Sequence, residues 1–344
     1  MNLLILTQKV DKNDPDFFFF YKWIEEFSKQ CEKVTVICLF EGEHDFPMNV
    51  QVLSLGKEMN PSRIQYMTKF YSYIWKQRKN YDHVFVHMNQ EYVVMGGLLW
   101  KVWGKKISLW YTHRQVNLKL KIAEKLSSII FTASNEGFGV PSKKVHVMGH
   151  GIDTESLSVL QNEYPESFVG MHIGRITKIK HIDIILRGIQ KLIQSGAPIT
   201  SFLIVGAPST EADQQYAQFL KSLVRELDLE DIVQFKGKIK NLDALREASF
   251  TVNAAPDGGM DKVVLESLVA GRPVFTSNNA FMSLFEEDAD EFIFAFSDPE
   301  DLKEKIEAFF KGKNQKEIIE GLSKKVEAEY SIQSLIENIL IYLE

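Results

Sequence analysis

Residues 256–275, PDGGMDKVVLESLVAGRPVF, contain the signals that decide the fold of the second half of the chain. A glycine pair, Gly258 and Gly259, precedes an apolar helical pattern over 263–270, and a new strand follows the helix. Glu266 lies on the second turn of this helix. A glycine pair before a helix indicates a close approach of a ligand to the backbone, because no Cβ atom intervenes. The alternative is a tight turn followed by a solvent-facing glutamate.

The same alternation of strands and helices extends over the whole chain. Apolar runs of strand length alternate with helical patterns, which is typical of doubly wound, mostly parallel sheets. Strands are expected at 3–6, 34–39, 50–53, 83–86, 107–111, 129–132, 145–148, 168–173, 202–205, 232–235, 250–253, 274–276 and 292–295. Helices are expected at 18–29, 64–76, 91–102, 118–126, 182–194, 211–227, 242–246, 263–270, 299–310 and 332–343. The sequence therefore predicts an α/β fold.

The length of the chain favours two domains, because 344 residues exceed one ordinary hydrophobic core. The polar segment 153–166 is the best candidate for the joint. We expect a Rossmann-like domain over 1–160, a second one over 161–326, and a C-terminal helix over 327–344 that packs back toward the first domain. In such sheets ligands bind at the carboxyl ends of the strands.

The charge distribution points to an anionic partner. The net charge is −6, but residues 51–150 carry fifteen Lys and Arg against five Asp and Glu, a local balance of +10. Such a basic block is typical of proteins that bind nucleic acid, a phosphorylated substrate or a membrane surface. The two cysteines are too few for a disulfide framework, and no window reaches the ~20 apolar residues of a membrane span. We therefore expect a cytoplasmic protein.

A second candidate site lies in residues 173–183, IGRITKIKHID. A strand ends at Gly174 and Arg175, and Lys180 stands just before a long amphipathic helix. Two cations beside a helix N-terminus suit a pyrophosphate, because the backbone N–H groups and the helix dipole favour anions. The alternative is that both cations are solvated in a loop. No Walker A or G-x-G-x-x-G pattern follows the first strand, so a P-loop or dinucleotide site is not indicated.

Five segments in order resemble a known family: MGHGID, GRITKIK, LIVGAPS, VQFKGKIKN and GGMDKVVLESLVAGRPVFTSN. They resemble the C-terminal half of family-4 retaining glycosyltransferases of the GT-B fold. The resemblance is strong over residues 145–290 and loose in the first half of the chain. It implies two Rossmann-like doubly wound domains that face each other across a cleft, with a nucleotide-sugar donor on the second domain.

The resemblance also implies roles for individual residues. Gly174, Arg175 and Lys180 match the family motif that holds the nucleotide diphosphate, and Glu266 matches the glutamate that holds the ribose. The remaining donor-binding positions are Lys238 and Ile239 at the base, and Asp257, Gly258, Gly259, Met260, Asp261, Lys262 and Val263 around the glycine turn and the helix start.

The glycine turn departs from the family pattern at one position. Gly258 stands eight residues before Glu266, where the family has a glutamate that contacts the donor sugar. Asp257 and Asp261 flank the gap, and either could supply the carboxylate. The departure concerns the choice of donor sugar, because the predicted diphosphate and ribose positions are intact.

Polar residues after strands in the first half complete the candidate site. His113 follows an interior strand, and the resemblance implies that it lies near the donor sugar and the reaction centre. His87 ends the preceding strand in the same way and is a second candidate. Gln8, Lys9 and Asp11 follow the first strand and are candidate contacts to phosphate or acceptor. A structural role is the alternative for each histidine.

The predicted function is transfer of a sugar, with retention, from a UDP- or GDP-linked donor to a hydroxyl of a glycan or lipid-linked acceptor. Arg175, Lys180 and the helix N-terminus at Val263 would stabilise the leaving diphosphate, with His113 as a further catalytic residue. Neither a metal nor another cofactor is expected, because no His, Cys and Asp cluster has ligand spacing, and nucleic acid is not an expected partner. The alternatives are a nucleotide-sugar 2-epimerase of the same fold and a non-catalytic GT-B partner subunit.

One helix of the basic block suits an anionic membrane. Residues 62–81, SRIQYMTKFYSYIWKQRKNY, interleave cations with aromatic side chains. This combination is typical of the lipid headgroup region, where each nearby cation contributes about 1 kcal/mol. We expect Tyr71, Trp75 and the cations at 76–79 to face the inner leaflet of the plasma membrane. The alternative is that the aromatic stripe packs into the core and the cations are solvated.

Overall fold

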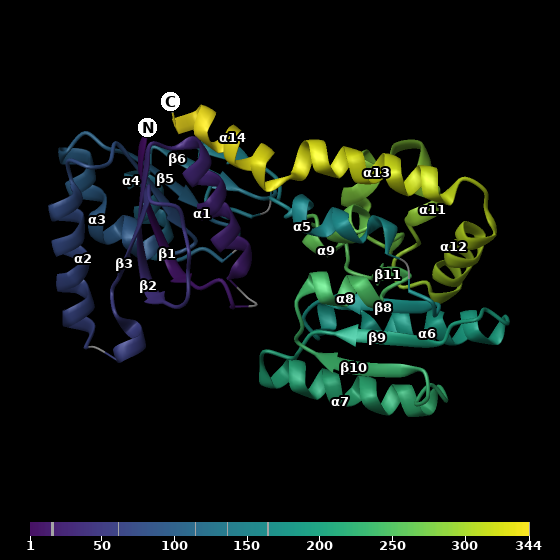
Figure 1. The fold of residues 1–344 in the computed structure, drawn as a ribbon. Coiled ribbons are helices and arrows are strands. Elements are labelled where there is room, and N and C mark those ends of the chain that lie inside the picture. The colour runs from purple at the N-terminus through teal and green to yellow at the C-terminus, as the bar shows by residue number, and fades with distance from the viewer. Residues whose placement is uncertain (15–16, 61, 114, 136, 164, 344) are drawn as a thin grey trace. The chain divides into compact units, whose positions relative to one another are not determined.

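The computed structural model describes residues 1–343 except 15–16, 61, 114, 136 and 164. Contacts divide the chain into two compact units. The first unit is formed by Met1–Gly151 together with Ile332–Glu344, and the second by Ile152–Ser331 (Figure 1). The last helix, α14 (Ile332–Leu343), is therefore part of the first unit.

A parallel sheet of seven strands forms the centre of the first unit, in the order β3-β2-β1-β4-β5-β6-β7. The strands are β1 (Asn2–Val10), β2 (Lys33–Glu41), β3 (Val50–Ser54), β4 (His83–His87), β5 (Lys106–Trp110), β6 (Ile129–Thr132) and β7 (Val145–Val147). The side chains of Leu3, Leu4, Ile5 and Leu6 in β1 are all fully buried. Burial on both faces explains why this segment of β1 is a continuous apolar run without alternation.

Helices cover both faces of this sheet (Figure 1). On one face lie α2 (Arg63–Gln77), α3 (Gln90–Val102) and α4 (Leu118–Leu126), with buried residues such as Phe70 and Trp100 in the core beneath them. On the other face α1 (Phe18–Gln30) packs against α14. Leu335, Ile336 and Ile339 of α14 join the core that α1 forms with the sheet. Apolar burial therefore attaches the end of the chain to the first unit.

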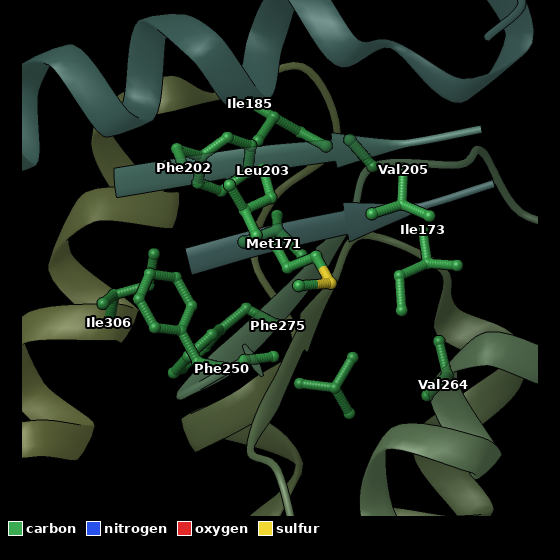
Figure 2. Close-up of a cluster of buried hydrophobic side chains, with 14 of the residues drawn as sticks. Met171, Ile173, Ile185, Phe202, Leu203, Val205, Phe250, Val264, Phe275 and Ile306 are labelled. Carbon is green, nitrogen blue, oxygen red and sulfur yellow. The ribbon is translucent and has the colours of Figure 1, made fainter. Parts of the chain in front are cut away.

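A parallel sheet of five strands forms the second unit, in the order β10-β9-β8-β11-β12. The strands are β8 (Val169–Ile173), β9 (Ser201–Val205), β10 (Val233–Gly237), β11 (Phe250–Asn253) and β12 (Val274–Thr276). Figure 2 shows Met171, Phe202, Phe250 and Phe275 in the core around these strands.

The helices of the second unit connect these strands and pack around them. The longer ones are α6 (Ile182–Gln194), α7 (Glu211–Glu226), α8 (Asn241–Glu247), α9 (Lys262–Val269), α12 (Pro299–Lys311) and α13 (Gln315–Tyr330). Short helices α5 (Thr154–Ser158), α10 (Met282–Phe285) and α11 (Ala289–Phe292) and five 3-10 turns, η1 (Lys57–Met59), η2 (Val159–Asn162), η3 (Lys178–Lys180), η4 (Asn279–Phe281) and η5 (Glu286–Asp288), complete the described elements of the chain. The order of the strands places the ends of β8 and β11 side by side, which positions the candidate site.

Most predicted elements agree with the structure; one predicted strand is wrong, and α13 and the short helices α5, α10 and α11 were not predicted. The strand predicted at 292–295 is wrong: Phe292 ends α11, and the segment forms one isolated bridge, between Thr276 and Ile293. Phe292 and Phe294 are buried, so the apolar pattern reflects core burial without a sheet partner. Helix α13 was not predicted, although Ile319, Leu322 and Val326 form its buried face.

Within the described part of the chain, no helix is long and apolar enough to cross a membrane.

Candidate functional site

Three adjacent strands of the second unit end in glycines. Gly174 after β8, Gly206 after β9 and Gly237 in β10 have φ angles of 154°, 138° and 71°. The Gly174 N–H donates to the carbonyl of Val205 at 2.9 Å, and the Gly206 N–H donates to Gly237 at 2.8 Å. A Cβ atom on Gly206 would lie 1.9 Å from the carbonyl oxygen of Gly174, so the close backbone approach requires glycine. Gly206 belongs to the candidate site, and the sequence prediction did not single it out.

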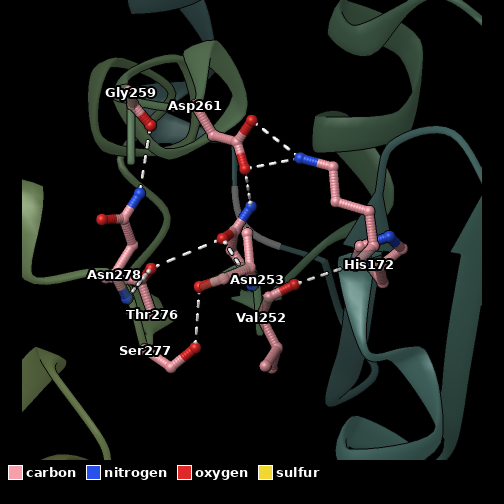
Figure 3. A network of polar contacts seen from close by, with 10 residues as sticks. His172, Val252, Asn253, Gly259, Asp261, Thr276, Ser277 and Asn278 are labelled. Atoms are coloured by element: carbon pink, nitrogen blue, oxygen red, sulfur yellow. Dashed lines mark hydrogen bonds and ion pairs between the residues drawn. The ribbon is translucent and has the colours of Figure 1, made fainter. Parts of the chain in front are cut away.

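Lys180 lies at this edge and forms an ion pair with Asp261. Its Nζ donates to Oδ1 and Oδ2 of Asp261 at 2.7 and 2.6 Å. Asn253, the last residue of β11, donates from Nδ2 to Asp261 Oδ2 at 2.8 Å (Figure 3). The loop after β8 and the loop before α9 are thus joined by one carboxylate. The sequence prediction named both charged residues but did not foresee that they pair.

The Lys180–Asp261 pair is partly buried and keeps Asp261 ionised. Burial raises the pKa of Asp261, but the Lys180 ammonium and the hydrogen bonds from Lys180 and Asn253 outweigh burial and hold the pKa below its usual value. The side chain of Asp261 is 28% exposed and that of Lys180 is 20% exposed, so solvent can still reach both. An anionic ligand at Lys180 must therefore share the ammonium with a carboxylate.

His172 on β8 is fully buried beside this pair. Its Nδ1 donates to the carbonyl of Val252 at 3.1 Å, which makes Nε2 the unprotonated nitrogen. No described residue forms a hydrogen bond with Nε2. Burial lowers the pKa of His172 to about 4, so the ring is neutral at pH 7.

The residues that follow β12 donate hydrogen bonds to the backbone of the glycine turn and of the segment before it. Asn278 donates from Nδ2 to the carbonyl of Gly259 at 3.1 Å, and Ser277 donates to the carbonyl of Ala255 at 3.0 Å (Figure 3). Asp257, which is exposed, accepts from the backbone N–H and Nδ2 of Asn279 at 2.8 and 3.1 Å. Both carboxylates that flank Gly258 therefore have protein partners. Asn278 has no counterpart among the sequence predictions.

Helix α9 begins directly after Asp261, which occupies its N-cap position. The Asp261 side chain makes no capping hydrogen bond to the helix. Glu266, on the second turn, accepts from Asn241 Nδ2 at 2.5 Å, and Lys262 Nζ lies 3.9 Å from its other oxygen. Met260 and Val263 are partly buried against the core. The helix thus presents an N-terminus without a side-chain cap at the same edge as Lys180.

The other predicted residues of the second unit lie at or near this edge. Arg175 is exposed directly after Gly174, and it forms no ion pair with any residue that the structure describes. Lys238 is exposed directly after β10, and Ile239 is partly buried against the core.

In the first unit, the structure separates the two histidine candidates. His113 is exposed three residues after β5, and its ring contacts Tyr111 edge-on at 5.7 Å. His87 is 2% exposed and stacks on Phe20 with ring centroids 3.7 Å apart. Burial lowers the pKa of His87 to about 3. Aromatic side chains of α1 cover the His87 ring, which favours the structural alternative for this residue.

Of the candidates at the end of β1, Lys9 and Asp11 pair with each other. Strand β1 continues to Val10, so Gln8 and Lys9 belong to the strand and not to the loop after it. Lys9 forms ion pairs with Asp14 and, at 3.1 Å, with Asp11. Gln8 is exposed. Among the described residues, no group of His, Cys, Asp and Glu could hold a metal ion.

The arrangement in the second unit matches a known family. Residues 167–311 match the family model for glycosyl transferases group 1. Over these residues the chain is similar to that family. The match bears out the predicted glycosyltransferase resemblance for the segment that carries Gly174, Lys180, Asp261 and Glu266. Comparison with curated protein sequences gave no match.

Solved structures confirm the predicted GT-B fold for the whole chain. Anabaena HepE in complex with UDP has a TM-score of 0.72 at 16% identity, covering 100% of this chain and 99% of that one. A glycosyltransferase from Rickettsia africae has a TM-score of 0.74 at 12% identity, covering 100% and 98%. Sucrose-phosphate synthase from Thermosynechococcus elongatus has a TM-score of 0.72 at 12% identity, covering 99% and 98%. The family match and the fold together support the prediction of a glycosyltransferase.

Proposed function

We propose that the protein is a retaining glycosyltransferase that uses a UDP- or GDP-linked sugar as donor. The observation that carries this proposal is the convergence, at one edge of the five-stranded sheet, of the glycine strand ends, Lys180 and the N-terminus of α9. Anabaena HepE, which has the same fold, is found in complex with UDP and with UDP-glucose. UDP-glucose is therefore the first donor to test.

The proposed chemistry is electrostatic. Arg175, Lys180 and the N-terminus of α9 would stabilise the charge that develops on the diphosphate as the glycosidic bond breaks. Because these groups already supply positive charge, we propose that the reaction needs no metal. Glu266 would accept the ribose hydroxyls, and the backbone at Lys238 and Ile239 would contact the base. Loss of one such stabilising donor typically costs about 10²–10³ in rate.

A binding experiment tests this site. Nucleotide binding is measured by calorimetry with UDP, GDP and ADP and their glucose esters. Lys180→Ala should weaken binding of the preferred nucleotide by at least about tenfold, since a charge-assisted hydrogen bond contributes about 1.5–3 kcal/mol. Lys178→Ala is the matched control, because Lys178 is exposed in the same turn. Unchanged affinity in Lys180→Ala would refute the site assignment.

The products distinguish the alternatives of the same fold. A glycosyltransferase incubated with donor alone should slowly release nucleoside diphosphate and free sugar. A 2-epimerase would return an epimeric nucleotide sugar, and a non-catalytic subunit would leave the donor intact. Separation of the nucleotides by chromatography decides among the three.

We further propose that the first unit binds the surface of an anionic membrane and that the acceptor is lipid-linked or lies near that membrane. The supporting feature is an apolar surface on α2, α3 and α4, here called the α2–α4 surface. Its members are large apolar side chains that solvent can reach: Ile64, Met67, Tyr71, Trp75, Leu98, Val102, Leu118 and Ile122.

Two contacts link α2 to α3 within this surface. The Tyr71 hydroxyl on α2 donates to the carbonyl of Met95 on α3 at 3.3 Å, and Trp75 contacts Trp103 with ring centroids 5.7 Å apart. Arg78 lies over the Trp75 ring at 4.4 Å. Phe70 and Ile74 of α2 are buried in the core, whereas Tyr71 and Trp75 are exposed. Helix α2 therefore has one buried and one exposed apolar face. Exposed apolar surface with cations at its edge is typical of membrane contact.

Sedimentation with liposomes tests the membrane proposal. Binding should require anionic lipid and fall with salt. The triple change Lys76→Glu, Arg78→Glu and Lys79→Glu should abolish it. Equal recovery in the supernatant with neutral and anionic vesicles at low salt would favour a soluble acceptor.

A further inference from the structure

The first unit contains an apolar cavity of about 470 Å³ between α2 and α3, beside the carboxyl ends of β2 and β3. Leu55, Met67, Phe70, Tyr92 and Met95 form much of its wall. A volume of this size lies within the range of about 300–1,000 Å³ typical of small-molecule sites. The cavity belongs to the first unit alone and is separate from the nucleotide site described above.

The floor of the cavity is formed by buried side chains, and partly exposed methionines lie in its wall. Leu55, Phe70 and Tyr92 are 1%, 0% and 5% exposed. Met67 and Met95 are partly exposed, one on each helix. Methionine side chains are flexible and polarisable, so they adapt to chains of different shape. These walls favour an unbranched or isoprenoid hydrocarbon chain.

The rim of the same cavity is cationic. Arg63, at the first turn of α2, is exposed and forms no ion pair with any residue in the described part of the chain. Lys119 also lines the rim, and its Nζ lies 3.1 Å from Glu91. The N-terminus of α3 opens here, and its N-cap residue Asn89 makes no side-chain cap. Two cations, one carboxylate and the positive end of a helix dipole leave a net preference for an anion.

We propose that this cavity binds a lipid phosphate, with its hydrocarbon chain against Phe70 and Met95 and its phosphate at Arg63 and Lys119. An apolar wall continuous with a cationic rim matches a ligand that has one long chain and one anionic group. The cavity also adjoins the α2–α4 surface, because Met67 belongs to both. A lipid phosphate could therefore enter it from a membrane. The inference rests on the proposed function in one respect: the bound lipid phosphate is the carrier part of the acceptor.

Direct binding of a short probe tests the site without any glycosyl transfer. Farnesyl phosphate, farnesol and inorganic phosphate are titrated separately into the full-length protein in calorimetry. The proposal expects farnesyl phosphate to bind, farnesol to bind at least about tenfold more weakly because it lacks the charge-assisted contacts, and inorganic phosphate to give no measurable heat. Farnesol binding as tightly as farnesyl phosphate, or no binding of farnesyl phosphate, would overturn it.

Matched variants locate the binding to the cavity. Met95→Trp fills the cavity and should abolish binding of farnesyl phosphate, whereas Leu98→Trp, one turn further along α3 and 67% exposed, should leave it unchanged. Arg63→Gln should weaken binding by about tenfold, and Arg78→Gln, a cation outside the cavity, should not. Thermal melting shows whether each variant folds.

The remaining outcomes separate this inference from its premises. If Met95→Trp and Leu98→Trp reduce binding equally, the probe adsorbs to the α2–α4 surface and the cavity is not its site. UDP binding to the second unit should be unchanged in every variant. If the unaltered protein does not bind UDP, the proposed function is contradicted. The farnesyl phosphate titration would still test the cavity.

Discussion

Replacing Asp261 with asparagine should tighten the binding of a nucleoside diphosphate. Both oxygens of Asp261 now lie 2.6–2.7 Å from Lys180 Nζ. A phosphate oxygen on the same ammonium would lie at a similar distance from the nitrogen, and so roughly 4–5 Å from the carboxylate. Two unit negative charges 4 Å apart repel by about 1 kcal/mol in water and about 4 kcal/mol at the effective dielectric constant of a protein surface.

The partial exposure of this pair favours the lower part of that range. With Asp261 28% exposed, we expect relief of about 1–2 kcal/mol, which is roughly 5- to 30-fold in affinity. The effect should be larger for UDP than for UDP-glucose, because loss of the sugar ester adds a negative charge to the β-phosphate. Asp261 would thus favour release of the product over retention of it.

The assay is calorimetry with UDP and UDP-glucose on Asp261→Asn and on the control Asp257→Asn. Asp257 is exposed and engaged with Asn279, so its variant should change neither affinity by more than about twofold. Weaker UDP-glucose binding with unchanged UDP binding would instead assign Asp261 to the sugar hydroxyls. If Asp261→Asn alters neither affinity, Lys180 does not hold the diphosphate, and the reasoning fails.

Three further predictions follow from the same geometry. Glu266→Gln should weaken UDP binding and reduce the preference for UDP over its 2′-deoxy analogue, and an unchanged preference in competition assays would exclude a ribose role. The pKa of His172 is about 4 in the folded protein against 6.5 unfolded, so the unfolded chain gains its proton first as pH falls. The free energy of unfolding in urea should therefore drop by about 2 kcal/mol from this residue between pH 7 and pH 5, and His172→Gln should flatten that slope. Gly206→Ala should destabilise the protein by more than about 2 kcal/mol and weaken UDP binding, because its Cβ would meet Gly174. Gly196 has a φ of 92° and open space around it, so Gly196→Ala measures the cost of backbone strain alone. If both variants lose the same free energy of unfolding, the proposed clash at Gly206 is refuted.

The sequence by itself predicted the strands of both sheets, because the apolar pattern of each segment indicates its burial and its secondary structure. Strands buried on both faces need continuous apolar runs, and the inner strands β1, β4 and β9 have them. Helix α13 was missed because its pattern is polar and includes Gly321. Its burial comes from packing against α9, which lies far away in the sequence. The glycine after β8 and the spacing of Lys180 were also visible, since strand ends and helix starts have local signals.

Only the tertiary structure decided what each polar side chain contacts. His87 ends β4 and His113 follows β5, yet aromatic residues of α1 cover His87, whereas His113 is exposed. Lys180 and Asp261 are 81 residues apart, and they meet because β8 and β11 are adjacent in the sheet. The pairing of strands is a long-range property that no single segment encodes. Strand order therefore decides which charged side chains surround a ligand at this edge of the sheet. The sequence pattern predicts only that the strands end there.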